Sequence, residues 1–290
     1  MSLTSFLSDD GELRILLDQT FPKPEFAMEV PRRAEPQTRN YALIGTAFDY
    51  VLRFWLERQY PDAETKPWVA HQGLQLAQAL PMDPATPEGQ SLESFLDAIE
   101  ERHAAYLESG EMTDELLGGT LDLARFDWVY RSGRPPESLG EHAEGDLADL
   151  RQLLAIIPEA EFRGADSVLL NPTFGDASRL VNGADADLVF DGLLLDIKTV
   201  KDLSLKVGYW RQLVGYAVLT DLAADDTTVP SQFDEIGVYF ARHGALWRTA
   251  TDAIYGHPKY DQFADWFRER ATEHFGGDFP GAGHRSQWPR

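Results

Sequence analysis

Apolar positions recur at helical spacing over much of the first half of the chain. Between residues 41 and 59 they fall every three or four residues, which predicts a helix that ends before Pro61. A short helix is expected at 9–19, followed by an irregular stretch with four prolines up to residue 40. Segments rich in proline and glycine then separate four further predicted helices, at about 66–81, 88–109, 113–131 and 139–157.

The pattern changes after Pro158, where short apolar runs are separated by turn residues. Strands are predicted at 168–170, 186–190 and 193–200, with a loop at 171–178. Asp191-Gly192 favours a tight hairpin between the last two strands. The remaining predicted elements are a helix at about 204–221, a second hairpin formed by 235–241 and 245–250, and an amphipathic helix near 258–275. This order predicts an α/β fold in which a mixed central sheet is flanked by helices, with a large helical segment ahead of it.

Composition narrows the class of protein. Hydrophobic residues make up 43% of the 290 positions, which is ample for a packed core. The net charge of −22 argues against a surface that coats nucleic acid or anionic lipid. The absence of cysteine excludes disulfides, thiolate zinc sites, cysteine nucleophiles and iron–sulfur clusters. With no basic leader and no apolar run of membrane-spanning length, we expect a soluble, cytoplasmic protein without membrane contact.

The first predicted hairpin carries acids and a lysine among its apolar residues. Asp196 and Lys198 are two residues apart on one strand, so their side chains share a face. Asp187 lies on the preceding strand, across the two-residue turn, and can converge with Asp196 on one hard cation. Carboxylate oxygens are the ligands that Mg²⁺ or Mn²⁺ prefers, and a neighbouring lysine can orient or deprotonate a bound water.

Acid-x-Lys triplets also arise by chance in a chain this acidic. Glu64-Thr65-Lys66 is a second one, in a predicted polar loop with no strand acid before it. Asp196-Ile197-Lys198 lies inside an apolar strand, where charges are costly unless they are paired or used. An ion pair on a solvent-facing strand stays the alternative interpretation of this triplet.

The helix predicted after the hairpin adds Gln212 and Tyr216, which share a face at i,i+4 spacing. Together with the Ala-Asp-Leu-Val run that contains Asp187 and with Asp196-Ile197-Lys198, this pattern resembles the PD-(D/E)XK nuclease superfamily, in particular its RecB-type exonuclease-like branch. The resemblance covers about residues 165–250 and the helix at 41–57. It divides the chain into five parts: an N-terminal segment (1–40), a first core helix (41–59), a helical insertion (60–158), a nuclease-like α/β core (159–276) and a C-terminal tail (277–290).

The resemblance implies a restriction-endonuclease-like core with the element order αβββαβ. Asp187 and Asp196 would be ligands of Mg²⁺ or Mn²⁺, assisted by the carbonyl of Ile197. Lys198 would be the catalytic lysine. Gln212 and Tyr216 would complete the catalytic site from the helix.

Members of this branch often carry a Gly-x-x-x-His motif on the first core helix, with the histidine as a further metal ligand. This chain has Gly45-Thr-Ala-Phe-Asp49, so an aspartate stands where that histidine would. Asp49 is therefore a candidate metal ligand, and an ion pair with Arg53 at i,i+4 is the alternative. Asp185 is a possible substitute ligand on the strand.

These features favour a metal-dependent nuclease that hydrolyses single- or double-stranded DNA, in DNA repair or phage defence, with RNA as another possible substrate. Cations at 198–211 and 238–250, among them Arg242 and Arg248, predict a local basic surface beside the acids. The alternative function is a catalytically silent module with the same fold. It would bind a protein partner or nucleic acid through residues 60–158.

Overall fold

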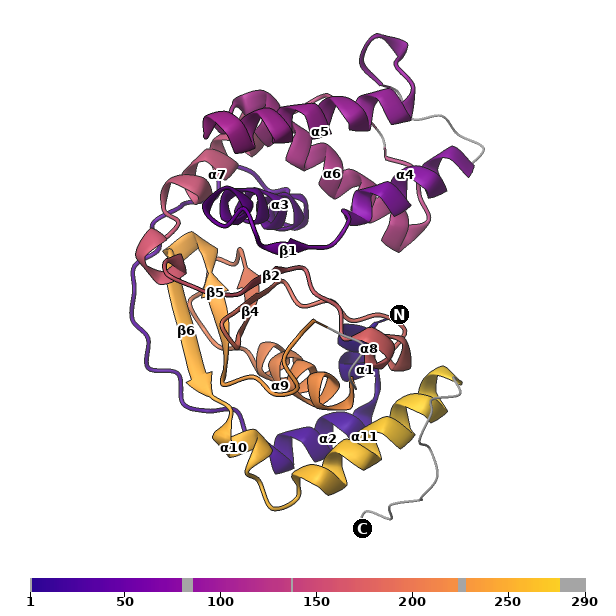
Figure 1. The fold of residues 1–290 in the computed structure, drawn as a ribbon, viewed down its shortest axis with the longest axis vertical. Helices are drawn as coiled ribbons and strands as arrows, with labels where there is room; N and C mark the ends of the chain where they lie inside the picture. Colours follow the sequence, from indigo (N-terminus) through magenta and orange to yellow (C-terminus); the bar gives the residue numbers. More distant parts are fainter. Residues whose placement is uncertain (1, 80–85, 137, 224–227, 277–290) are drawn as a thin grey trace.

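A six-stranded sheet lies between two groups of helices in the described part of the chain, residues 2–79, 86–136, 138–223 and 228–276 of this computed structural model (Figure 1). The strands follow one another in chain order: β1 (Glu64–Thr65), β2 (Val168–Leu170), β3 (Leu188–Phe190), β4 (Leu193–Lys198), β5 (Glu235–Phe240) and β6 (Ala245–Ala250). β1–β2 and β4–β5 are parallel, and the other pairs are antiparallel. The predicted α/β class with a mixed sheet is confirmed.

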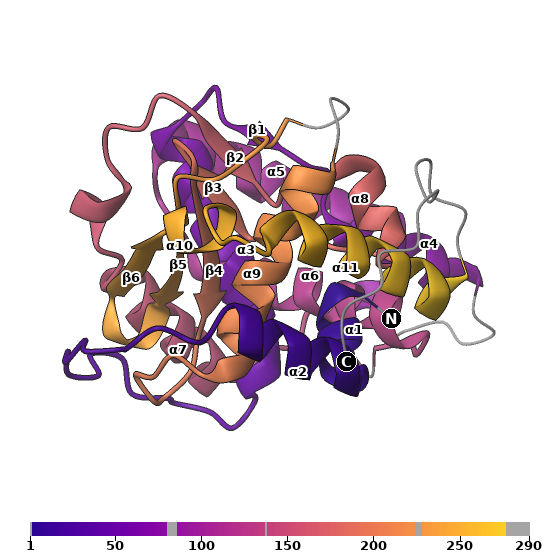
Figure 2. The same cartoon turned by 90° about the horizontal axis from the view of Figure 1, so that it is seen from below.

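One face of the sheet is covered by helices from both ends of the chain. They are α1 (Leu3–Asp9), α2 (Gly11–Thr20), α8 (Gly175–Leu180), α9 (Val207–Leu222), α10 (Asp252–Tyr255) and α11 (Tyr260–Phe275). α9 lies next to the sheet, and α1, α2 and α11 lie over α9 (Figures 1 and 2). Val189 and Leu194 of the strands share a core with Leu213 of α9. Burial of each such side chain contributes roughly 1.5–3 kcal/mol to holding the helices on the sheet.

The opposite face is covered by α3 (Tyr41–Gln59), the predicted first core helix, together with the helical segment. That segment contains α4 (Val69–Ala79), η1 (Pro87–Gly89), α5 (Leu92–Ser109), α6 (Asp114–Ser132), α7 (Glu144–Ala155) and η2 (Glu159–Phe162). Because strand side chains alternate, Leu195 enters a core with Phe48 of α3, whereas Leu194 enters the core of α9. A third core, with Phe54 of α3 and Phe126 of α6, lies within the helices.

The hairpin between β3 and β4 fixes the positions of the predicted site residues. Asp191 and Gly192 both have positive φ, 45° and 85°, which is the geometry of a two-residue type I′ turn. The register that this turn sets, continued one residue beyond the last pair of β3 and β4, puts Asp187 opposite Asp196. The predicted tight hairpin is confirmed.

Some elements differ from the sequence predictions. Two helices precede residue 21, because Asp10 ends α1 and caps α2 by accepting a hydrogen bond from the N–H of Leu13 (2.9 Å). The loop prediction at 171–178 is wrong for residues 175–178, which belong to α8, and the loop prediction for Glu64–Thr65 is wrong because these residues pair with β2. The predicted tail at 277–290 lies outside the described residues, and the boundaries of the insertion stay a prediction.

A fully buried ion pair joins the helical segment to the sheet. Arg242 lies in η4 (Ala241–His243), at the turn of the second predicted hairpin, and Asp149 lies in α7. The guanidinium nitrogens of Arg242 lie 2.6 and 3.0 Å from the carboxylate oxygens of Asp149, and Nε donates to the carbonyl of Thr199 (3.1 Å). The prediction that Arg242 belongs to a basic surface is wrong, since its side chain is 0% exposed. It holds the segment after β4 in place.

Replacement of one partner should destabilise the protein strongly. In Asp149→Ala the guanidinium stays buried without its counter-ion, and we expect the free energy of unfolding to fall by about 3–5 kcal/mol. Urea denaturation at neutral pH measures this. Arg248→Ala is the control, because Arg248 forms an exposed pair with Glu235 and its loss should cost less than about 1 kcal/mol. Equal losses in the two variants would contradict a structural role for the buried pair.

Candidate functional site

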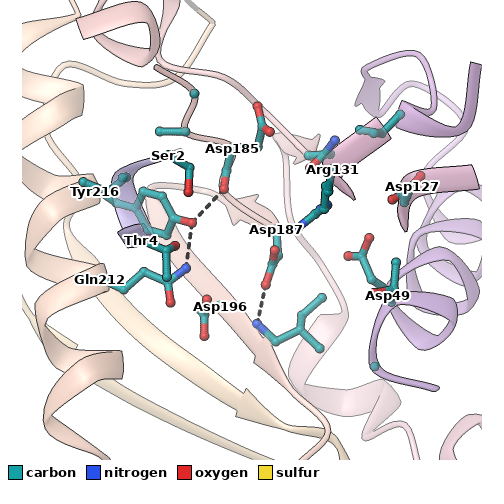
Figure 3. A pocket seen from close by; sticks show the side chains of 18 of the residues that line it. Ser2, Thr4, Asp49, Asp127, Arg131, Asp185, Asp187, Asp196, Gln212 and Tyr216 are labelled. Atoms are coloured by element: carbon teal, nitrogen blue, oxygen red, sulfur yellow. Dashed lines mark hydrogen bonds between the residues drawn. The ribbon is translucent and has the colours of Figure 1, made fainter. Parts of the chain in front are cut away.

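A pocket of about 860 Å³ lies between the sheet and the helical segment. Its walls come from the start of α1, from α3, α6 and α9, and from the β3–β4 hairpin with the loop that precedes it. Every residue predicted for the site lines it: Asp49, Asp187, Asp196, Ile197, Lys198, Gln212 and Tyr216. Figure 3 shows Gln212 and Tyr216 on the α9 side and Asp49 on the side of the helical segment. The fold thus brings together residues that are far apart in the sequence.

Asp187 and Asp196 face each other across the hairpin; Asp196 is buried and Asp187 is half-buried. Oδ2 of Asp187 accepts a hydrogen bond from the backbone N–H of Ile197 (2.6 Å). Burial, together with the negative charges of Asp196 and Asp49, raises the pKa of Asp187 to about 8. Burial also raises the pKa of Asp196, which is 1% exposed. Two carboxylates are therefore held in a place where neither ionises easily without a compensating cation.

Lys198 lies on the same strand face as Asp196. Its Nζ is 2.6 Å from Oδ2 of Asp196 and donates a hydrogen bond to Oε1 of Gln212 (3.3 Å). Burial favours the neutral amine, but the charges of Asp196 and Asp187 outweigh it and raise the pKa of Lys198. Lys198 is thus held as an ammonium ion. The alternative interpretation of the Asp196–Lys198 pair, an ion pair on a solvent-facing strand, is wrong because the Asp196 side chain is buried.

A chain of hydrogen bonds connects Lys198 to the wall of the pocket. Nε2 of Gln212 donates to the hydroxyl oxygen of Tyr216 (2.8 Å), and the Tyr216 hydroxyl donates to the carbonyl of Asp185 (2.7 Å), as the dashed lines in Figure 3 show. Phe174 stacks on the Tyr216 ring at 5.4 Å between centroids. The amide of Gln212 is therefore fixed in the orientation that accepts from Lys198. The carboxylate of Asp185 also lines the pocket.

Asp49 reaches the site because α3 passes close to the end of β4. A Cβ on Gly45 would lie 2.9 Å from Oγ1 of Thr199, so glycine permits this approach. One turn further along α3, Oδ2 of Asp49 pairs with Arg53 (2.7 Å). Oδ1 is buried and makes no hydrogen bond with any described residue. Asp49 therefore forms the ion pair and faces the acids of the hairpin as well, which its effect on the pKa of Asp187 shows.

α6 supplies pocket residues that the sequence analysis did not predict. Asp127, Tyr130 and Arg131 line the pocket from one side of this helix. The hydroxyl of Tyr50 donates to Oδ1 of Asp127 (2.7 Å), and burial raises the pKa of Asp127 to about 6. Their i, i+3, i+4 spacing was the available signal, but nothing in the sequence places α6 opposite the hairpin.

Several cations predicted to form a basic surface are paired with acids instead. Arg211 pairs with Asp18 (2.5 Å), and Arg248 pairs with Glu235 (3.2 Å). The prediction of a basic surface at 238–250 is therefore wrong. In the window 198–211, two lysines are exposed: Lys201 and Lys206.

The donor set of the pocket fits a hard divalent cation. Asp49, Asp187 and Asp196 are three carboxylates, and the cations paired with them are Lys198 and Arg53, which leaves one negative charge. Oδ1 of Asp49 is buried and accepts no hydrogen bond from the described residues, whereas Oδ2 of Asp196 is held by the Lys198 ammonium. No group of three His, Asp or Glu side chains in the described ranges is arranged as a complete ligand set. Backbone carbonyl and water oxygens would have to contribute.

Comparisons with known proteins add no family to this picture. A scan against protein-family models finds no match, and searches of curated proteins and of solved structures find none. The resemblance to the PD-(D/E)XK superfamily therefore stays a prediction. Among the described residues, no helix is long and apolar enough to span a membrane.

The buried acid of α6 should make stability depend on pH. Because the pKa of Asp127 is raised from 3.8 to about 6, the folded protein holds this proton more tightly than the unfolded chain. The resulting stabilisation is complete below the unfolded pKa and is lost as pH rises to about 6. The side chain in Asp127→Asn stays neutral. From about pH 4 to 7 the variant should therefore gain roughly 2–3 kcal/mol of unfolding free energy relative to wild type. Parallel pH profiles for the two proteins in urea denaturation would contradict this.

Proposed function

We propose that this protein is a metal-dependent nuclease that hydrolyses DNA phosphodiester bonds. The observation that carries the proposal is one arrangement in the pocket. Asp187 and Asp196 lie opposite each other on a hairpin, Asp196 buried and Asp187 half-buried, with Lys198 on the same face and 2.6 Å from Asp196. Buried acids next to a lysine are costly for stability, and their position in an open pocket is typical of catalytic groups.

The order of the secondary-structure elements supports the same proposal. α3, β2, β3, β4, α9 and β5 follow one another as αβββαβ once the two-residue strand β1, the helical segment and the short α8 are left out. This is the order that the resemblance to restriction-endonuclease-like nucleases implies. The acids lie on β4 and next to β3, and α9 contributes Gln212 and Tyr216, as that resemblance requires.

Each residue has a role that its contacts support. Asp187, Asp196 and the carbonyl of Ile197 would hold Mg²⁺ or Mn²⁺, whose chemistry at this site is Lewis-acid polarisation of the phosphoryl group. Lys198, kept as a cation by the acids, can hydrogen-bond the attacking water or a phosphate oxygen and offset developing negative charge. Gln212 positions the Lys198 ammonium through its Oε1.

Asp49 has a different position from the two hairpin acids. It approaches from α3, and one of its oxygens is already paired with Arg53. The remaining oxygen, Oδ1, is available as a further metal ligand or as an acceptor for a water molecule. Asp49→Asn should therefore weaken activity less than Asp196→Ala does.

Cleavage assays test the proposal. The purified protein should cut single- or double-stranded DNA in the presence of Mg²⁺ or Mn²⁺, and Asp196→Ala and Lys198→Ala should each lower the rate by about 10²-fold or more. Lys66→Ala is the matched control. It removes the lysine of the other acid-x-Lys triplet, which lies beside the exposed strand β1, and it should cut like wild type. RNA strands of the same sequence, tested in the same assay, show whether the substrate is DNA or RNA. Equal residual cutting by wild type and Lys198→Ala would refute the catalytic assignment.

A catalytically silent module is the second candidate function. The net charge of −22, and the pairing of Arg211, Arg242 and Arg248 with acids, favour it, because few free cations remain to bind a nucleic acid. In this case the helical segment would bind a protein partner, or a nucleic acid, without cleavage.

Metal affinity separates the two candidates. Calorimetry with Mn²⁺ should show one binding event in the wild type and none in Asp187→Asn/Asp196→Asn, because both variant side chains lose the charge that binds the ion. Lys66→Ala should bind Mn²⁺ like wild type. Heat that is absent in the wild type, or unchanged in the double variant, would favour the silent module.

A further inference from the structure

Two groups of cationic and aromatic side chains lie near α3, one beside its start and one beside its middle. The first is on α6, where Tyr130 and Arg131 line the pocket that contains the acids. The second lies at the start of α3, where Tyr41, Lys201 and Arg39 line a smaller pocket of about 500 Å³. The acids lie between the two groups.

The Arg131 group is available for an anion. Within the described residues no hydrogen bond or ion pair holds the Arg131 guanidinium, whereas its charge acts on both Asp127 and Asp185. Figure 3 shows Arg131 between these two acids, on the far side of the pocket from Tyr216. Tyr130 beside it is 50% exposed. A guanidinium next to an exposed aromatic ring can bind a phosphate while the ring stacks on a base.

The Lys201 group has the same composition. Lys201 donates from Nζ to the hydroxyl of Tyr41 (2.7 Å) and lies over its ring at 4.4 Å. Tyr41 is 43% exposed, and Arg39 is exposed beside it. Lys201 therefore covers one face of the Tyr41 ring and brings positive charge to it.

The two pockets lie along the same two segments of the chain. Tyr41, Gly45, Asp49 and Arg53 follow one another at i,i+4 on α3; the first lines the smaller pocket and the other three line the larger one. The end of β4 and the chain that follows it also line both pockets. Lys198 lines the larger pocket, and Lys201, three residues on, lines the smaller one. Twelve residues of helix span about 18 Å, which at the 3.4 Å rise of a stacked strand is roughly five nucleotides.

We propose that this face of α3 guides one unpaired nucleic-acid strand past the acids, with Arg131 and Tyr130 holding it on one side and Lys201 and Tyr41 on the other. An unpaired strand fits better than a duplex. Asp196 is 1% exposed, and α6 covers the pocket opposite the sheet, so a phosphate must enter between two layers of protein. The inference rests on the proposed nuclease function for its position relative to the acids.

Binding of fluorescein-labelled single-stranded DNA, followed by anisotropy in EDTA, tests this path without any cleavage. Arg131→Ala and Lys201→Ala should each weaken binding about tenfold and lower the slope of log K against log salt by about 0.7. Tyr130→Ala and Tyr41→Ala should weaken binding by a similar factor with an unchanged slope, and Tyr130→Phe and Tyr41→Phe should retain binding. The matching duplex should bind more weakly.

Two controls lie on or just after α6 and outside the pocket. Trp128→Ala removes an aromatic ring that is 59% exposed, and Arg134→Ala removes an exposed cation; both should bind like wild type. Wild-type affinity in Arg131→Ala and Lys201→Ala, or a duplex that binds as tightly as the single strand, would overturn the path. Binding as expected without Mg²⁺-dependent cleavage would refute the nuclease function alone. If Arg131→Ala and Lys201→Ala cleave DNA with the KM of the wild type, the proposed path is refuted and the nuclease function is not.

Discussion

Three neighbouring carboxylates in one pocket are the constraint on which the rest of the site depends. Asp49, Asp187 and Asp196 come from two different layers of the fold. Asp49 raises the pKa of both hairpin acids, and Asp196 raises that of Asp187. Burial also favours the protonated form of Asp187 and Asp196. Lys198 and Arg53 offset two of the three charges, so the pocket is arranged to accept one more cation. The hydrogen bonds of Gln212 and Tyr216 and the close approach at Gly45 place these charges correctly.

The helical segment is part of the site as well as a cover for the sheet. α6 contributes Asp127, Tyr130 and Arg131 to the pocket, and α7 anchors the chain after β4 through Asp149. Arg242, which forms that anchor, also binds the carbonyl of Thr199, immediately after Lys198. One buried guanidinium therefore connects the helical segment to the backbone that carries Lys198.

The sequence allowed much of this arrangement to be predicted, because it depends on local rules. Asp191-Gly192 determines the turn, the turn determines the register, and period-two alternation then puts Asp196 and Lys198 on one face. What failed depends on long-range packing. Arg242 looks like a free cation in the sequence, and only the position of α7 shows that Asp149 neutralises it. The contribution of α6 could not be predicted either, because helical periodicity does not say which face meets the sheet.

The most direct test of the account is an anomalous diffraction measurement on crystals soaked in Mn²⁺, at a wavelength where manganese scatters anomalously. The account predicts a peak contacted by carboxylate oxygens of Asp187 and Asp196 and by the carbonyl of Ile197, and no such peak in crystals of Asp196→Ala. A soaked wild-type crystal with no peak between these acids, or with manganese bound only elsewhere, would contradict the claim that the buried carboxylates form a metal site.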